Sequence, residues 1–209
     1  MRLVRVWFSK TGDARYISHL DTVRTMTRAL RRAGVPLWYT EGFNRHPYLT
    51  FAAPLSLGYE GLRECMDIKL EDDTVSLDEV ARALDAAMPR GFAILGADEA
   101  VRKVNDLGWS IYELRFNCDG EQVKRLESAE ELIVEKKGKK GTRPVDIRPL
   151  MRDIRLLGNV LFVKLPTSCE SGINPAMVVT ALRALTGDES IDAHILRHAL
   201  LTADGEQFA

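Results

Sequence analysis

The sequence predicts an α+β fold made of two tandem ferredoxin-like (βαββαβ) domains with antiparallel sheets. The main observation is that strand-like and helix-like segments follow one another in the order β-α-β-β-α-β, once in each half of the chain. A length of 209 residues, of which 45% are hydrophobic, suits two globular domains of about 100 residues each. We therefore expect a first domain over residues 1–100 and a second over residues 108–209.

Two segments of the first half carry the start and stop signals of helices. The first begins after Ser18, has Asp21 at the reciprocal position of a capping box, and ends at Gly34. The second begins after Ser76, with Glu79 three residues further on, and runs to residue 88. Alternating or β-branched segments predict strands at residues 3–8, 37–40, 64–70 and 92–97.

The second half repeats this order and adds an insertion. Helices are predicted at residues 121–128 and 175–186, and the second of them has Asn174 as its N-cap and Pro175 in its first position. A Lys- and Gly-rich insertion within residues 136–148 has little apolar area to bury, so we expect a loop or hairpin tip there. Residues 146–155 predict a short helix or turn. Strands are predicted at residues 110–117, 131–135, 160–165 and 193–202.

Charge is unevenly distributed along the chain, although the net charge is only −1. Residues 1–58 carry nine Lys and Arg against three Asp and Glu, and residues 136–164 carry nine against two. By contrast, residues 59–135 carry nineteen acidic residues against nine basic ones, and residues 165–209 carry six against two. These blocks predict a basic face and an acidic face, an arrangement that attracts polyanions. The alternative is that the charges intermix once the chain folds.

Several classes of protein are disfavoured by the composition. The three cysteines, Cys65, Cys118 and Cys169, are odd in number and far apart, which argues against a disulfide framework and against a Cys-based metal site. We therefore expect no metal and no cofactor in this chain. No apolar run approaches the roughly 18 residues of a membrane span, and the N-terminus lacks a signal peptide, so we expect no membrane association and a cytoplasmic location.

The predicted first helix carries a row of arginines. Arg24, Arg28 and Arg31 follow the spacing i, i+4, i+7 and therefore share one face, which Arg32 flanks. No acidic residue follows Asp21 in this helix to pair with them. The planar guanidinium group suits phosphate, so the row predicts a binding site for an anion, with a merely solvated face as the alternative.

The loop that follows combines aromatic and cationic residues. Phe43 and Tyr48 flank Arg45, and Asn44 permits unusual backbone angles, a combination suited to stacking on an unpaired base and holding its phosphate. His19 and His46 are candidate catalytic residues, because an imidazole can transfer protons near neutral pH. The insertion adds four lysines as a candidate electrostatic arm: Lys136, Lys137, Lys139 and Lys140.

At these positions the chain resembles the radical-SAM-associated proteins, which carry a domain of unknown function, either fused to the C-terminal end of a radical SAM protein or as a separate chain. The resemblance rests on the motif of residues 16–21, on residues 28–36, on Gly42-Phe43-Asn44 with His46-Pro47, and on residues 54–58. The family usually has Pro where Arg45 stands. The resemblance implies a cytoplasmic bacterial protein that works with a radical SAM partner. At the level of fold, the chain also resembles the tandem ferredoxin-like RNA-processing proteins that cleave CRISPR repeats.

Three functions remain open from the sequence. The first is an RNA- or phosphate-ligand-binding accessory protein of a radical SAM enzyme, with no catalytic activity of its own. The second is a metal-independent endoribonuclease that uses His19 and His46 as general base and acid. The third is a protein–protein adaptor that binds the radical SAM partner through the acidic segment 59–135, without nucleic acid. The chain lacks a CxxxCxxC motif, so an iron–sulfur cluster of that type would belong to the partner.

Overall fold

The computed structural model describes residues 1–138, 141–167 and 172–208. It is a mixed α+β fold in which strands pair mostly antiparallel and, within those ranges, four α-helices are present. The α+β prediction is therefore confirmed at this level. The chain divides into two compact units, Met1–Leu107 with Gln207–Ala209, and Gly108–Glu206.

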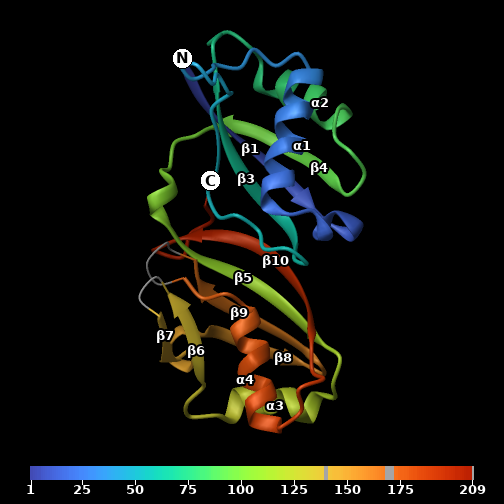
Figure 1. Ribbon diagram of the computed structural model, residues 1–209, viewed down its shortest axis with the longest axis vertical. Coiled ribbons are helices and arrows are strands. Elements are labelled where there is room, and N and C mark those ends of the chain that lie inside the picture. Colours follow the sequence, from blue (N-terminus) through green and yellow to red (C-terminus); the bar gives the residue numbers. More distant parts are fainter. Residues whose placement is uncertain (139–140, 168–171, 209) are drawn as a thin grey trace. The chain divides into compact units, whose positions relative to one another are not determined.

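The first unit is a sheet with two helices (Figure 1). Its strands lie side by side in the order β4-β1-β3-β2, and the pairs β1–β3, β1–β4 and β2–β3 are all antiparallel. In chain order the elements are β1 (Arg2–Lys10), α1 (His19–Arg32), β2 (Leu49–Phe51), β3 (Glu60–Leu70), α2 (Leu77–Ala86) and β4 (Phe92–Glu99).

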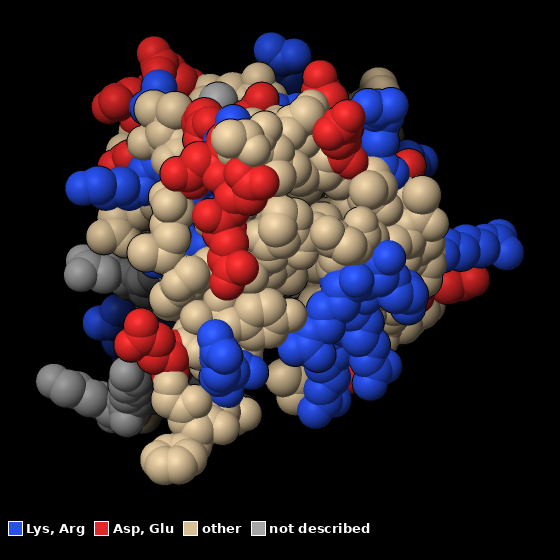
Figure 2. Space-filling view, turned by 90° about the horizontal axis from the view of Figure 1, so that it is seen from above, with Lys and Arg blue, Asp and Glu red and all other residues tan. Residues whose placement is uncertain are grey.

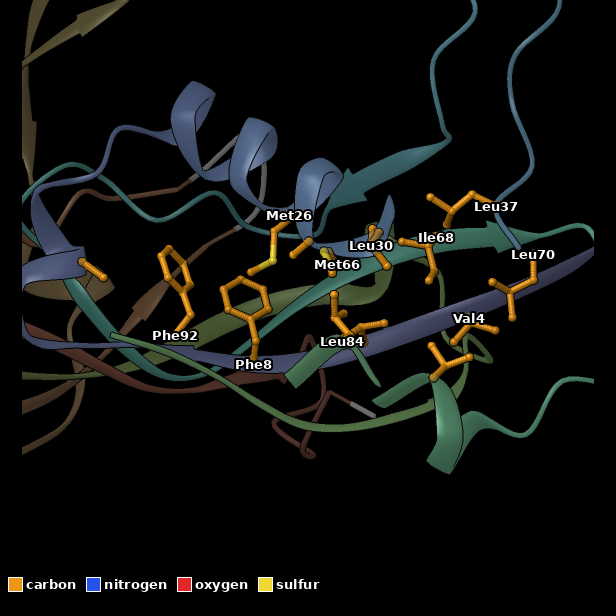
Figure 3. Packing of buried hydrophobic residues seen from close by; sticks show 14 residues of the cluster. Val4, Phe8, Met26, Leu30, Leu37, Met66, Ile68, Leu70, Leu84 and Phe92 are labelled. Carbon is orange, nitrogen blue, oxygen red and sulfur yellow. The ribbon is translucent and has the colours of Figure 1, made fainter. Parts of the chain in front are cut away.

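The core of the first unit lies between the sheet and its helices. Val4, Val6 and Phe8 of β1 belong to this core and share one side of the strand, because successive side chains point to opposite faces. The intervening Arg5 and Trp7 are buried on the other side. Met26 and Leu30 of α1 are fully buried in the same core as the three β1 residues (Figure 3). Removing a large apolar side chain of this kind from water stabilises the fold by about 1.5–3 kcal/mol. The apolar stripe of α1 therefore fixes which side of the helix faces outward.

The two predicted helix starts are confirmed by their capping bonds. The Ser18 Oγ accepts a hydrogen bond from the backbone N–H of Asp21 at 3.1 Å, and Ser76 accepts one from Glu79 at 3.4 Å. These side chains satisfy backbone donors that the first turn of a helix leaves without a partner. At the other end of α1, Gly34 has a φ of +67°, where a residue with a Cβ would be strained.

The predicted strand at residues 37–40 is wrong, and the edge strand β2 begins nine residues later than that prediction's end. Residues 37–48 instead form an arm, a narrow antiparallel loop in which Tyr39 pairs with Pro47. The N–H of Thr40 donates to the His46 carbonyl at 2.9 Å, and the N–H of Tyr48 donates to Trp38 at 3.2 Å. The base of the arm is tied to the sheet, because Leu37 forms an isolated bridge with Leu70 of β3 and the N–H of Trp38 donates to the Lys69 carbonyl at 2.9 Å. Beyond this point the segment pairs with its own return, and its two legs leave the core together (Figure 3).

The second unit has a four-stranded sheet and a separate hairpin. Its sheet order is β10-β5-β9-β8, while β6 and β7 pair only with each other in the described residues. In chain order the elements are β5 (Leu107–Phe116), α3 (Gly120–Ser128), β6 (Ile133–Gly138), β7 (Gly141–Asp146), β8 (Arg152–Leu157), β9 (Val160–Pro166), α4 (Ala176–Thr186) and β10 (Ala193–Thr202).

Three details of the second unit differ from the prediction. The insertion is a paired hairpin over most of its length, because residues 133–138 and 141–146 form a regular antiparallel ladder. Residues 146–155 contain only a short 3-10 turn, Arg148–Leu150, before the edge strand β8 begins. At α4, Pro175 occupies the N-cap, and Asn174 instead accepts a hydrogen bond from Ala176 N–H at 2.9 Å. None of the helices in the described ranges has the length and apolar character needed to cross a bilayer.

Candidate anion-binding surface

The arginine row of α1, defined as Arg24, Arg28 and Arg31, lies on the solvent side of the helix. Thr22, Met26, Ala29 and Leu30 hold the opposite side of α1 against the sheet. All three arginines of the row and the neighbouring Arg32 are exposed. The helix is therefore anchored by one side while its guanidinium groups are presented by the other.

One arginine of the row has a carboxylate partner. Arg24 Nη1 lies 2.9 Å from Asp21 Oδ1, so the prediction that the row lacks an acidic partner is wrong at this position. Asp21 precedes Arg24 by three residues, which places the two side chains on neighbouring turns. A hydrogen bond from Ser18, followed by one from Arg24, lowers the pKa of Asp21. The first turn of α1 is thus locally balanced, and the excess positive charge lies further along the helix.

The last turn of α1 joins the arginine row to the arm. Arg31 Nε donates to the Tyr39 hydroxyl at 3.3 Å, and its guanidinium carbon lies 5.7 Å from the centre of that ring. Arg32 Nη2 donates to the carbonyl of Ala87, just after α2, at 2.6 Å. Both cations also lie at the helix end that carries the negative end of the macrodipole. These contacts bring Arg31 and the arm together as parts of one surface.

The outer part of the arm carries exposed aromatic and cationic side chains. Phe43 is completely exposed, with 113% of its reference area accessible, and Asn44 and Arg45 are exposed beside it. Gly42 has a φ of +107°, a conformation that glycine permits at the turn. His46 Nδ1 lies 2.9 Å from the carbonyl of Asn44, which can only accept, so this contact requires the tautomer protonated on Nδ1.

Tyr48 lies at the base of the arm, in a place that the sequence did not indicate. The Nζ of Lys69 is 4.5 Å from the ring centre of Tyr48 and 5.0 Å from that of Trp38, so two rings contact one ammonium group. Cation–π contacts of this kind are worth about 0.5–1 kcal/mol at exposed sites. Lys69 and Trp38 were missed because they come from different segments, and nothing in their spacing signals that they meet.

The two histidines are held by different partners. The His19 ring packs edge-on against Phe51, with 5.2 Å between the ring centres, whereas His46 is bonded within the arm. His46 precedes Phe51 by five positions, which span roughly 16 Å when the backbone is extended. In the described part of the chain, none of the contacts given for His19 or His46 joins the two imidazoles.

Of the four lysines of the insertion, two lie in the described part of the chain. The Nζ of Lys136 donates to the carbonyl of Gly172 at 2.7 Å, so this side chain has a structural partner. Lys137 lies in β6. Lys139 and Lys140 lie outside the described residues.

A buried lysine supports the start of α1 and was not predicted as a functional residue. Lys10 is only 1% exposed, and its Nζ donates to the carbonyl of Ile17 at 2.7 Å, one residue before the Ser18 cap. Burial lowers the pKa of Lys10, and the nearby Glu64 opposes this shift. This bond fixes the segment that leads into the arginine-bearing helix.

Figure 2 shows Lys and Arg side chains gathered in one group on the face seen from above, apart from a row of Asp and Glu side chains. Across the part of the chain that the structure describes, no group of three or more His, Cys, Asp or Glu side chains is placed to hold a metal ion. The groups that α1 and the arm expose are the guanidinium groups of the arginine row and the aromatic ring of Phe43.

Over residues 3–186, the sequence matches the family described as "Uncharacterized protein conserved in bacteria (DUF2344)". The chain belongs to this family. In this DUF2344 protein the arginine row and the arm lie inside the matched range, and β10 lies beyond it. The family description names neither a reaction nor a partner.

Comparisons with individual proteins add little. No curated protein matches the sequence. Among solved structures, one reported as the crystal structure of an unknown protein from Galdieria sulphuraria is 14% identical, with 94% of this chain and 98% of that chain covered. The TM-score of 0.28 is too low to support any inference about this DUF2344 protein.

Proposed function

We propose that this chain is an RNA- or phosphate-ligand-binding accessory protein that works with a radical SAM enzyme. The observation that carries the proposal is the exposed arginine row of α1 and its link through Arg31 and Tyr39 to the arm. Guanidinium groups would hold phosphates, and the exposed ring of Phe43 beside Arg45 would stack on an unpaired base. The radical SAM partner is inferred from the motif resemblance alone.

We also propose that the chain consists of two tandem ferredoxin-like domains. We interpret both units as ferredoxin-like, because each has a β-α-β-β-α-β order once the hairpin β6–β7 is set aside. The sheet order β4-β1-β3-β2 of the first unit has its counterpart in β10-β5-β9-β8 of the second. Tandem units of this kind would give an RNA two related platforms.

The test is RNA binding by a charge-reversal variant of the arginine row. Arg28→Glu with Arg31→Glu is expected to weaken binding roughly 100-fold or more in a filter-binding titration at low salt, because two phosphate contacts become repulsive. Lys124→Glu with Arg125→Glu, on α3, makes the same change of charge elsewhere and is expected to bind like the wild type. Affinity unchanged by the α1 pair would refute the proposal.

A second candidate function, the adaptor, is favoured by Phe43. A fully exposed aromatic side chain at the tip of an arm is typical of an anchor that enters a pocket on a partner protein. The two candidates differ in their response to the same variant. Capture of the radical SAM partner that survives Arg28→Glu with Arg31→Glu but is lost in Phe43→Ser would favour the adaptor.

A further inference from the structure

The sheet of the second unit has one side that its helices do not cover. Ser110, Tyr112 and Leu114 of β5 are buried and face the side of α3 and α4, whose Val123 and Leu182 are also buried. The alternate residues therefore point to the opposite side, here called the open face. Strand pairing places these residues there together: Trp109, Ile111, Glu113 and Arg115 of β5, and Phe162 and Lys164 of β9.

A β-bulge adds two arginines to the open face. Arg152 pairs with Lys164 and Arg155 pairs with Phe162, so three steps along β8 match two steps along β9. Residues three apart in a regular strand point to opposite sides, but the extra residue of a bulge corrects the alternation. Asp153, with a φ of +51°, lies within the bulge. Both arginines therefore join Lys164 on the same side of the sheet.

The cations of the open face lie over and beside aromatic rings. The guanidinium carbon of Arg152 is 4.3 Å from the ring centre of Trp109, and the Nζ of Lys164 is 5.4 Å from it. Trp109 Nε1 also donates to the carbonyl of Ala203 at 3.3 Å, which fixes the ring. The rings of Phe162 on β9 and His198 on β10, the strands on either side of β5, lie 6.0 Å apart. Cations and rings thus alternate across this face.

The acidic residues of the open face are largely engaged. His198 Nε2 and Arg115 Nη2 each donate to Glu113, both at 3.0 Å. Burial raises the pKa of Glu113, but these hydrogen bonds outweigh it and leave the pKa lowered. Asp153 lies 3.9 Å from Lys164 and is 76% exposed, so this pair is weak. Four Arg and Lys side chains face two carboxylates, and the balance is positive.

The open face is also hollowed. A depression of about 670 Å³ is lined by residues of β5, β8 and β9, including Ile111, Arg155, Leu157, Phe162 and Lys164. This volume lies within the range of about 300–1,000 Å³ that is typical of ligand pockets. Leu157, one of the lining residues, is 74% exposed. The lining of the depression thus combines apolar side chains with the cations of Arg155 and Lys164 and the carboxylate of Asp153.

We propose that the open face of the second unit binds a single strand of nucleic acid, with bases against Phe162 and phosphates held by Arg152, Arg155 and Lys164. This inference rests on the proposed function, since it gives the same anionic strand a second surface. A single strand fits better than a duplex, because only unpaired bases can contact a ring in a depression. An acidic peptide would use the cations but would gain little from the ring of Phe162.

The experiment measures binding of a labelled oligouridine of about 12 nucleotides by fluorescence anisotropy on the full chain. Phe162→Ala is expected to weaken binding about tenfold, and Phe162→Tyr, which keeps a ring, to retain it. Arg152→Gln with Arg155→Gln is expected to reduce the slope of log K against log salt by about 1.4, because two phosphate contacts are lost. Lys124→Gln with Arg125→Gln on α3 is the matched control and is expected to leave the slope unchanged.

The outcomes separate the two proposals. Loss of binding in Arg28→Glu with Arg31→Glu, together with wild-type affinity in all open-face variants, would leave the proposed function standing and overturn this inference. Loss of binding in the open-face variants, together with wild-type affinity in Arg28→Glu with Arg31→Glu, would support binding at the open face and overturn the role of α1. A deoxyuridine strand bound as tightly as RNA would support recognition of phosphates and bases without the 2′-hydroxyl. If uridine monophosphate competes as well as the oligomer, the open face binds a single nucleotide, and the proposal of a bound strand is overturned.

Discussion

At the scale of single residues, the start of α1 is set by a few polar bonds. Lys10 holds the Ile17 carbonyl from within the core, and the Ser18 Oγ caps the helix through Asp21 N–H. The Ser18 hydroxyl also donates to the Asp21 carboxylate at 2.7 Å. Ser18 and Asp21 are thus joined by two hydrogen bonds, so loss of one side chain affects the other.

Ser18→Ala is expected to lower the free energy of unfolding by about 1 kcal/mol at neutral pH, because the cap is lost. The hydrogen bond from Ser18 lowers the pKa of Asp21 below its ordinary value of 3.8. A carboxylate of this kind contributes stability that is present above its ordinary pKa and is lost as the pH falls through the lowered, folded-state pKa. Urea unfolding of wild type and variant at pH 7 and at about pH 2.5 measures this, and the destabilisation is expected to be smaller in acid. An equal loss at both pH values would contradict the coupling to Asp21, and Ser18→Thr is the control that keeps the cap.

At the scale of elements, the bulge in β8 decides what the open face carries. Without the extra residue, Arg152 and Arg155 would point to opposite sides of the sheet. Asp153 takes the left-handed conformation in this bulge, and Asp tolerates that region better than most residues. The left-handed backbone conformation of Asp153 therefore helps to determine which side chains lie on the open face.

Asp153→Val is expected to lower the free energy of unfolding by about 2 kcal/mol relative to Asp153→Gly, because a β-branched residue is strained at positive φ. Both variants lose the weak contact to Lys164, so their difference isolates the backbone conformation. Urea denaturation of the two variants provides the measurement. Equal stability would show that residue 153 does not need the left-handed region.

At the scale of the whole molecule, the two ends of the sequence meet in the first unit. Arg5 and Asp67 form a buried bidentate pair, with distances of 2.8 and 3.0 Å, and the guanidinium carbon of Arg5 lies 4.3 Å from the ring centre of Phe208. Burial lowers the pKa of Arg5, but hydrogen bonding to Asp67 outweighs it and leaves the pKa raised. Phe208 is fully buried, so it keeps water from this pair.

Phe208→Ala is expected to destabilise the first unit by about 3 kcal/mol, since it removes a buried ring and exposes a buried ion pair. Trp7 and Trp38 both lie in that unit, so urea unfolding followed by fluorescence in a Trp109→Phe background reports on it. Phe208→Leu keeps most of the apolar volume and is expected to cost about 1 kcal/mol. A midpoint that does not move in Phe208→Ala would show that the C-terminal residues do not support this unit.

The sequence by itself determined the features that local physics controls. Capping residues and apolar periodicity predicted α1 and α2 and their starts, and the spacing of Arg24, Arg28 and Arg31 predicted one exposed row. The family match over residues 3–186 agrees with a domain of unknown function. These features depend on residues a few positions apart, so a single sequence contains them.

Only the tertiary structure decided which distant residues meet. Residues 37–40 have the composition of a strand, yet they form only isolated bridges, Leu37 with Leu70 of β3 and Tyr39 with Pro47 of the return segment, because pairing depends on partners and not on propensity. The contact of Lys69 with Trp38 and Tyr48, the partnership of Lys10 with Ile17, and the common side of Arg152 and Arg155 all depend on strand register. Register is fixed by the whole sheet, since a shift of one residue turns every side chain to the other side.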